Sequence, residues 1–448
     1  MNLAVPYRVQ TFVGLFASSL DKRKSVVFPL LLSCLLLCRG PKSYAGLSRT
    51  IVTYERNRAS VSKFFCRQRL HSRNIYEDAM NAVMDQFLEH GHVVKPVVWI
   101  LAIDGVCSKR GGFAKIDNAI KYRKKRKNAG PTTKAHTFIQ GLLITHTGMR
   151  IPLPRRTYYT RKYCRQHKKK YMKMTQLAAL IIATVKVPPL VRIVVVADEF
   201  FEGTIMDKAC NDREYIYIVP IDKRRCGEDQ YGKRTALNLH QHGKSLNRTK
   251  LKKIVFKPYQ ERTALLRRRT GDDKKQRVYF AISEVLRISG LGERTIVYSW
   301  KPHTKSRRWK SNWFKAFVSN AKDCDVATLI EYYELRWQIE IFFRELKSFM
   351  GLVDFTGGNF AAYERFVDMV LLAYLFLEWF RVQLLEECKR KKDLGKLQST
   401  RTRSLLHYFQ NEADVASVHY ITECGKKPEA LRVVLAAINK SRKTALNM

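Results

Sequence analysis

Five side chains that carry charge or form hydrogen bonds recur along residues 332–351, YYELRWQIEIFFRELKSFMG. This stretch has no Pro, and no Gly before its last residue, so it predicts one unbroken helix. At about 100° per residue the five side chains fall within one arc of roughly 80°, beside an arc of apolar side chains. They are Tyr333, Arg336, Glu340, Arg344 and Lys347. One carboxylate among several cations suits the binding of a metal ion together with phosphates.

The simpler alternative is a solvated helix face, because Arg336 with Glu340 and Glu340 with Arg344 are ordinary i, i+4 pairs. Two acids upstream argue against it. Asp104 and Asp198 each end an apolar run of strand length, VVWILAID and VRIVVVAD. An Asp at a strand end is more often a turn or cap residue than a ligand. Combined with Glu340, however, the two acids indicate a metal-assisted phosphodiester site.

The spacing of Tyr333, two residues, Arg336, three residues, Glu340, six residues and Lys347 resembles the signature of bacterial insertion-sequence transposases of the DDE class. The local text RWQIEIFFRELK strengthens the resemblance, which covers about residues 99–352 and, more loosely, the N-terminal segment. It implies an α/β fold with a ribonuclease-H-like mixed sheet. In that fold the first and fourth strands are neighbours, so Asp104 and Asp198 are expected to lie side by side.

The resemblance also implies the roles of the site residues. Asp104, Asp198 and Glu340 would be the catalytic acids and would hold Mg²⁺, with Mn²⁺ as a substitute, as two ions with Asp104 between them. DNA phosphates would be held by Tyr333, Arg336, Arg344 and Lys347. A Trp of the insertion would stack on a flipped base; Trp313 is nearest to the helix, Trp300 and Trp309 are alternatives, and core packing is the ordinary role of any single one. Other acids that sequence alone leaves open are Glu199, Glu202 and Asp207.

The implied function is a DNA transposase that binds terminal inverted repeats, nicks the ends and joins them to target DNA by a cut-and-paste route. Two protomers would bridge two ends, and a hairpin intermediate is implied by analogy alone. Three alternatives stay open: a catalytically silent or domesticated DNA-binding relative, a nuclease on the same core, and a structural RNA-binding protein.

Composition supports a nucleic-acid partner. Lys and Arg number 83 against 39 Asp and Glu, a formal net charge of +44, and the charge is spread along the whole chain. The ten Cys offer no zinc-ligand spacing and fit a reducing bacterial cytoplasm, where the protein would associate with the nucleoid. The apolar runs 26–38 and 370–385 are too short or too charged to span a membrane and are expected to be core helices.

The chain divides into five expected regions. They are a helical DNA-binding region (1–95), the first part of the catalytic core (96–200), a β-rich insertion (201–320), the second part of the core (321–388) and a basic helical tail with a possible role in dimerisation (389–448). In the first region a helix over 26–38 is expected to have Ser25 as N-cap and Pro29 in its first turn. Helices over 44–54 and 60–69 form either a helix-turn-helix unit or a basic hairpin that only packs on the core.

Overall fold

The structure of the protein is a computed structural model. It describes residues 5–50, 58–66, 71–89, 93–110, 116–122, 133–228, 234–246, 248–256, 277–300, 314–355, 357–390 and 402–426, with positions 429, 432 and 436.

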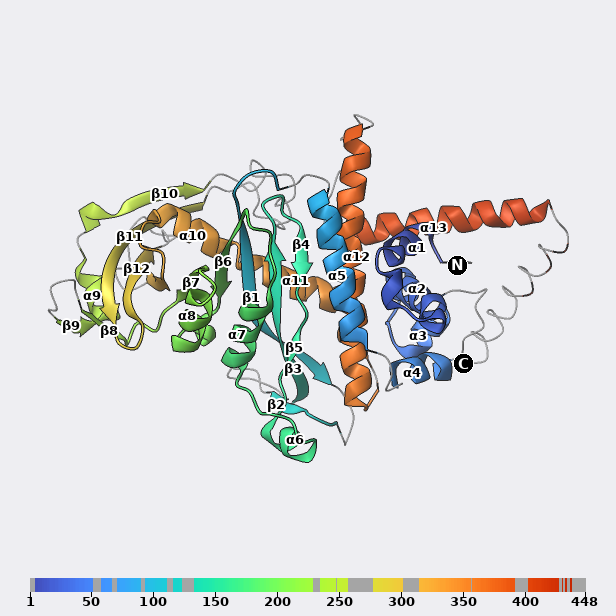
Figure 1. Ribbon diagram of the computed structural model, residues 1–448, viewed down its shortest axis with the longest axis horizontal. Coiled ribbons are helices and arrows are strands. Elements are labelled where there is room, and N and C mark those ends of the chain that lie inside the picture. The colour runs from blue at the N-terminus through green and yellow to red at the C-terminus, as the bar shows by residue number, and fades with distance from the viewer. Residues whose placement is uncertain are drawn as a thin grey trace, which may run out of the picture.

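One mixed sheet runs through the described residues, with strand order β2-β3-β1-β6-β7-β13-β12-β11-β8-β9, and β4, β5 and β10 pairing beside this path (Figure 1). The strands of its first half are β1 (Val97–Arg110), β2 (Ile120–Tyr122), β3 (Thr133–Ile144), β4 (Arg150–Pro152), β5 (Arg156–Thr157) and β6 (Val191–Ala197). β1 lies between β3, to which it is antiparallel, and β6, to which it is parallel. The strands expected to be neighbours, the first and fourth of the ribonuclease-H-like fold, are thus β1 and β6. The mixed α/β fold is ribonuclease-H-like as predicted.

The strand that carries Asp104 is longer than the sequence predicted. The apolar run ends at Asp104, but β1 continues to Arg110 because residues 105–110 pair with residues 134–139 of β3. Gly105, the residue after Asp104, lies opposite Ile139 within the ladder. The hydrogen bonds offered by β3 therefore decide where β1 ends, and the hydrophobic pattern does not.

The predicted hairpin and helix between the two Asp-bearing strands are present. β3 and β4 pair antiparallel around Gly148, whose φ of 81° suits glycine in this tight turn. The helix α7 (Met174–Thr184) follows and packs against β3. Between them lies the short helix α6 (Arg161–Gln166), which the sequence did not predict.

The strands expected between residues 201 and 320 continue the same sheet. β7 extends it parallel to β6, and β13 then pairs antiparallel with β7. These strands are β7 (Ile216–Pro220), β8 (Cys226–Glu228), β9 (Arg234–Asn238), β10 (Lys252–Phe256), β11 (Arg277–Ile288), β12 (Gly292–Trp300) and β13 (Phe314–Ser319). Short helices accompany them: η2 (Glu199–Phe201), α8 (Thr204–Asn211), α9 (Leu239–Ser245) and η3 (Arg248–Lys250).

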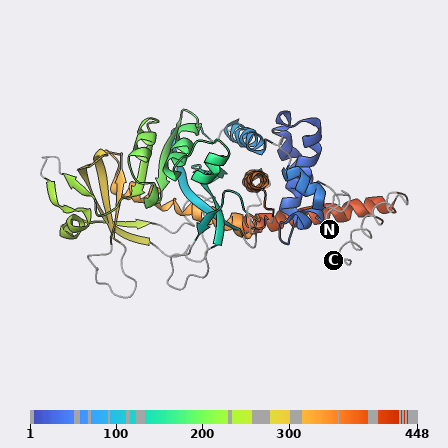
Figure 2. The same cartoon turned by 90° about the horizontal axis from the view of Figure 1, so that it is seen from below.

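A long apolar helix, α12 (Phe360–Arg390), stands between the sheet and the N-terminal helices, as Figure 1 and the end-on view of Figure 2 show. It packs against α5, α4 and α2. The helices around it are α1 (Tyr7–Gly14), η1 (Ala17–Ser19), α2 (Lys22–Leu37), α3 (Tyr44–Ser48), α4 (Arg58–Cys66), α5 (Ser72–Glu89) and α13 (Thr402–Gly425). Over the described residues, no helix has the length and apolar character to cross a membrane.

The start of α2 differs from the prediction. The helix begins at Lys22, so Ser25 lies inside it and Pro29 lies beyond its first turn. The Asp21 side chain accepts a hydrogen bond from the Lys24 N–H at 2.8 Å and thereby satisfies a free donor at the helix start. Of the expected helix-turn-helix, α3 and α4 are present, and residues 51–57 and 67–70 lie outside the described residues.

The expected single helix over residues 332–351 is two helices, α10 (Val326–Glu334) and α11 (Trp337–Ser348). At the junction, Leu335 donates its N–H to Tyr332 and Arg336 donates to Tyr333, which are i→i+3 bonds of a tighter turn. Helix propensity did not reveal this break, since Leu335 and Arg336 both favour helix. Tyr333 and Glu340 therefore come from different helices.

A buried cluster of charges fixes α11 against the sheet. Arg150 on β4 donates from Nη2 to Glu345 of α11 at 2.8 Å and lies 3.5 Å from Glu378 of α12. Glu378 also pairs with Arg381, one turn further along α12, and the Tyr374 hydroxyl donates to Glu345 at 3.1 Å. Two cations and two carboxylates balance one another, so burial of each is tolerated.

Replacing Glu345 by Ala should lower the free energy of unfolding by about 3–5 kcal/mol, because it leaves the Arg150 guanidinium buried without its closest carboxylate. Urea denaturation followed by circular dichroism measures the change. Glu423→Ala, which breaks an exposed pair with Lys426, is the control and should cost less than about 1 kcal/mol. Equal small losses in the two variants would show that the cluster does not anchor α11.

Candidate active site

The register of two parallel strands brings Asp104 and Asp198 together. Ile103 of β1 lies opposite Ala197 of β6, so the next residue of each strand is one of the two Asp. The Asp104 carboxylate accepts a hydrogen bond from the Gly105 N–H at 2.7 Å. Asp198 caps η2, and its carboxylate accepts from the Glu199 N–H at 2.9 Å. Both carboxylates are thereby oriented at the same edge of the sheet, Asp104 half-buried and Asp198 exposed.

Glu340 reaches this edge from the first turn of α11. Its carboxylate is one-third exposed and accepts a hydrogen bond from Nη2 of Arg336 at 2.6 Å. The Arg336 guanidinium in turn lies 5.7 Å from the centre of the Tyr333 ring, and that ring packs 4.5 Å from Phe317 of β13. Arg336 thus contacts both Tyr333 at the end of α10 and Glu340 in α11.

The pKa of Asp104 shows that the three carboxylates share one electrostatic environment. Burial raises the pKa of Asp104 to about 6, and the charges of Asp198 and Glu340 add to this rise. The Gly105 N–H and the Arg336 guanidinium act in the opposite direction. A carboxylate with a raised pKa beside two others is typical of a functional site, because like charges are costly to hold together.

Tyr333 and Arg336 respond to the same environment. Burial raises the pKa of Tyr333 to about 12, with Arg336 opposing and Asp198 and Glu340 adding to the rise. Burial by itself would lower the pKa of Arg336, but Tyr333, Glu340 and Asp198 outweigh it and the net pKa is raised. Both side chains therefore stay protonated across the physiological range and can act as hydrogen-bond donors.

Lys347 lies at the far end of α11, close to β1. Loss of hydration lowers its pKa, while the nearby Cys107 and Asp104 act to raise it. Arg344, one turn earlier, is exposed. Along α11, Lys347 lies close enough to Asp104 for that carboxylate to act on the pKa of the lysine.

The donor chemistry of the three acids fits a hard divalent cation, since all are carboxylate oxygens. Over the described residues, no three His, Cys, Asp or Glu side chains already stand in the arrangement of a metal site. Glu340 is bound to Arg336 instead. Arg336 holds one oxygen of the Glu340 carboxylate, so a bound ion would meet the other oxygen or displace the guanidinium.

The alternative acids have other partners. Asp207 accepts hydrogen bonds from Nε and Nη2 of Arg294 at 2.7 and 2.8 Å and from the Tyr217 hydroxyl at 2.7 Å. Glu202 pairs with Arg225 at 2.9 Å. Those two acids serve the packing of α8 and η2, and Glu199 is exposed beside Asp198.

Among the three candidate Trp, Trp300 is 6% exposed and packs 5.3 Å from Phe314, which supports the core role. Trp309 and Trp313 lie outside the described residues. One aromatic side chain at the site was missed: Phe200, two residues after Asp198, is 60% exposed. The pair Phe200-Phe201 after an apolar strand was its sequence signal, but only the structure shows that Phe201 is buried and Phe200 is not.

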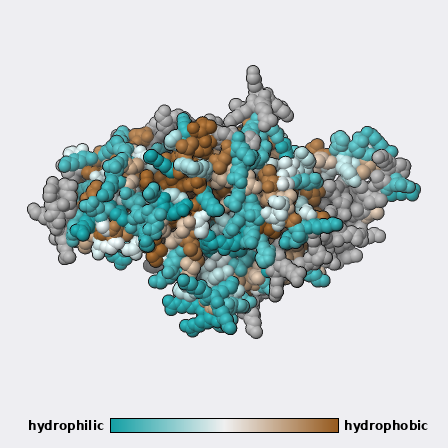
Figure 3. Space-filling view, viewed as in Figure 1, coloured by the Kyte–Doolittle hydropathy of each residue, from teal (hydrophilic) through white to brown (hydrophobic). Residues whose placement is uncertain are grey.

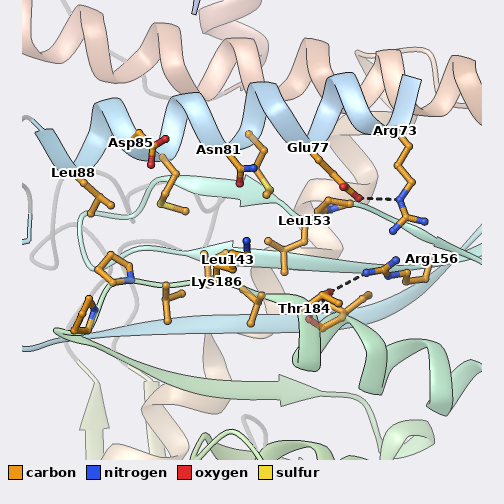
Figure 4. Close-up of a pocket in the computed structure, with 18 residues that line it drawn as sticks. Arg73, Glu77, Asn81, Asp85, Leu88, Leu143, Leu153, Arg156, Thr184 and Lys186 are labelled. Atoms are coloured by element: carbon orange, nitrogen blue, oxygen red, sulfur yellow. Dashed lines mark hydrogen bonds and ion pairs between the residues drawn. The ribbon is translucent and has the colours of Figure 1, made fainter. Parts of the chain in front are cut away.

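A pocket of about 800 Å³ lies away from these residues, between α5, β3 and the end of α7 (Figure 4). Its floor and walls are mainly apolar, and Figure 4 shows the Arg73–Glu77 pair and the Arg156–Thr184 hydrogen bond at one end. None of Asp104, Asp198 and Glu340 lines it. The charged edge of the sheet, and not this pocket, is thus the candidate active site.

Comparison with known families identifies the family of the chain. The family model described as the transposase DDE domain matches residues 98–376, which include Asp104, Asp198 and Glu340. The match covers more than half of the chain, so the protein belongs to the DDE transposase family and is an enzyme that acts on DNA. A search of curated proteins finds no match.

The raised pKa of Asp104 predicts a specific pH dependence of stability. In the unfolded chain this carboxyl loses its proton near pH 3.8, but in the folded protein only near pH 6. The folded state therefore binds more protons between these values, and its stability falls as the pH rises through them. In EDTA, the difference between the melting temperatures of Asp104→Asn and the wild type should change in favour of the variant from about pH 4 to pH 6. Above about pH 6 this difference should stay constant. Parallel curves for the two proteins would contradict this assignment.

Proposed function

We propose that the protein cuts DNA at the terminal inverted repeats of its own insertion sequence and joins the freed 3′ ends to target DNA. The observation that supports this most strongly is the parallel register of β1 and β6, which sets Asp104 beside Asp198, with Glu340 acting on the same carboxylate. Family membership supplies the class of reaction. The cut-and-paste route and its hairpin are the finer parts of the proposal.

Asp104, Asp198 and Glu340 would hold Mg²⁺, or Mn²⁺ in its place, as two ions with Asp104 shared between them. When bound, such ions lower the pKa of an attacking hydroxyl and stabilise the leaving oxygen. The raised pKa of Asp104 means that metal binding must displace a proton at mildly acidic pH.

Arg336 has two roles in this proposal. Without DNA it neutralises Glu340, which keeps three neighbouring carboxylates tolerable. With DNA present it would hold a phosphate, as Lys347, Arg344 and the Tyr333 hydroxyl would also do. The contact between Arg336 and Glu340 thus couples arrival of the substrate to release of the third acid.

The regions outside the core complete the proposal. The N-terminal helices α3 and α4, of which α4 carries Arg58 and Lys63, would contact the repeats. The tail beyond residue 389 would contribute to a homodimer that holds two ends. Trp313 would stack on a flipped base near the cut. Such a protein would work at the bacterial nucleoid.

Substitution of the acids tests the proposal. Asp104→Ala, Asp198→Ala and Glu340→Ala should each lower nicking and joining of a labelled terminal-repeat duplex by about a thousandfold or more, with DNA binding retained. Glu199→Gln is the comparison that should still cut, since Glu199 holds no position in the site. A wild-type protein that binds the ends but never cuts with Mg²⁺ or Mn²⁺ would favour a silent DNA-binding relative, and cutting without joining would favour a nuclease.

Substitution of the cations tests the phosphate contacts. Lys347→Gln should weaken DNA binding at every sequence alike and reduce the slope of log K against log salt by about 1, because one phosphate contact is lost. Fluorescence anisotropy over a range of salt concentrations measures both. Lys426→Gln, on the exposed end of α13, is the matched control. If the two variants give the same slope, Lys347 does not contact DNA.

A further inference from the structure

The short helix α6 and its flanks form a basic projection at the end of the sheet toward which β1 runs (Figure 1). We call residues 158–173 the α6 projection. No Asp or Glu occurs anywhere between Asp117 and Asp198. Figure 3 keeps the view of Figure 1, and the surface at this end of the molecule is hydrophilic in it. Exposed cations of the projection are Arg161, Lys162, Arg165, Lys168, Lys169, Lys170 and Lys173.

Across the described residues, none of these cations forms an ion pair with a carboxylate, whereas Lys208, Lys252 and Lys426 elsewhere each do. Lys169 acts on an acid only through its charge, which helps to lower the pKa of Glu364. A cluster of like charges repels itself, and it is stabilised when a polyanion lies against it. The projection therefore has the electrostatics of a phosphate-binding surface.

Stacked rings make the projection rigid. Tyr159 and Tyr163 stack at 5.5 Å, Tyr163 and His167 at 4.1 Å, and Tyr163 packs edge-on against Phe360 of α12 at 5.3 Å. The Lys169 ammonium lies 4.2 Å above the Tyr159 ring. Cations held in this way lose less conformational entropy on binding phosphates than free lysines do.

Buried polar contacts fix the base of the projection. The Tyr159 hydroxyl donates to Glu364 of α12 at 3.2 Å, and Thr157 donates to the same carboxylate at 2.7 Å. Arg155 lies 3.3 Å from Glu364 and 2.8 Å from Asp368. Glu364 and Asp368 are thus engaged at the base of the projection, while the exposed Asp117 is close enough to help raise the pKa of Tyr163. The exposed cations of the projection outnumber this acid.

The projection lies close to the carboxylates along the sheet. Val106 of β1 lies opposite Phe138 of β3, and Phe138 lies opposite Thr157 of β5, which leads into the projection. Val106 is two residues beyond Asp104, a distance of about 7 Å along a strand. The segment that leads into the projection therefore lies two strands across the sheet from the part of β1 just beyond Asp104.

We propose that the α6 projection binds the phosphate backbone of duplex DNA that continues past the cleaved bond, without reading its sequence. This inference rests on the proposed function, because it uses the carboxylate site to place the DNA. The DNA past the bond has two sources: flanking donor DNA before cleavage, and target DNA during joining. Both present the same backbone, so one surface would serve both steps.

Two arms of one experiment test the proposal with the full chain. In the first, EDTA prevents cleavage, and anisotropy measures binding to a terminal-repeat duplex with and without flanking DNA. In the second, joining of a pre-cut repeat end to an unrelated duplex is measured with Mg²⁺. The variant replaces Lys168, Lys169 and Lys170 by Gln. The control replaces three exposed lysines elsewhere, Lys95, Lys186 and Lys208, by Gln.

The variant should bind the flanked duplex about tenfold more weakly and lower its salt slope by about 2–3, while its affinity for the pre-cut end stays unchanged. A loss in the first arm identifies flanking DNA, and a loss confined to joining identifies target DNA. If the variant matches the control in both arms, the proposal is wrong. A wild type that binds flanked DNA but never cuts would refute the proposed function and leave the first arm valid.

Discussion

The parallel pairing of β1 with β6 is the constraint on which the site depends. Parallel neighbours end at the same edge of a sheet, so residues far apart in the chain become adjacent there. Ile103 and Ala197 lie opposite each other, and Asp104 and Asp198 are the residues that follow them. A shift of one residue in this register would turn one of the carboxylates to the opposite face.

The third acid needs a separate support, because Glu340 belongs to a helix and not to the sheet. The buried Arg150–Glu345–Glu378 cluster ties α11 to β4 and α12 five residues beyond Glu340. The i→i+3 turn between α10 and α11 then brings Arg336 onto Glu340. The sheet edge, the buried cluster and the helix break together define where the three carboxylates can meet.

Positively charged side chains are arranged differently near the carboxylates and on the α6 projection. Near the carboxylates, Arg336 has both an acid and a ring close by, Glu340 and Tyr333. Residues 158–173 of the α6 projection contain no acid, and Lys169 lies above the Tyr159 ring. The first arrangement suits chemistry, in which charge must be balanced before the substrate arrives. The second suits retention of a polyanion.

The sequence by itself identified the family and predicted that the strands of Asp104 and Asp198 are neighbours. Asp104 and Asp198 each follow an apolar run, and the spacing from Tyr333 to Lys347 identified the family, because these features are local patterns. Tertiary structure decided the rest. It extended β1 past Asp104, since the partner strand β3 supplies hydrogen bonds beyond the apolar run. It also broke the helix before Trp337, paired Asp207 with Arg294 and exposed Phe200, because packing between distant segments sets these features and local propensity does not.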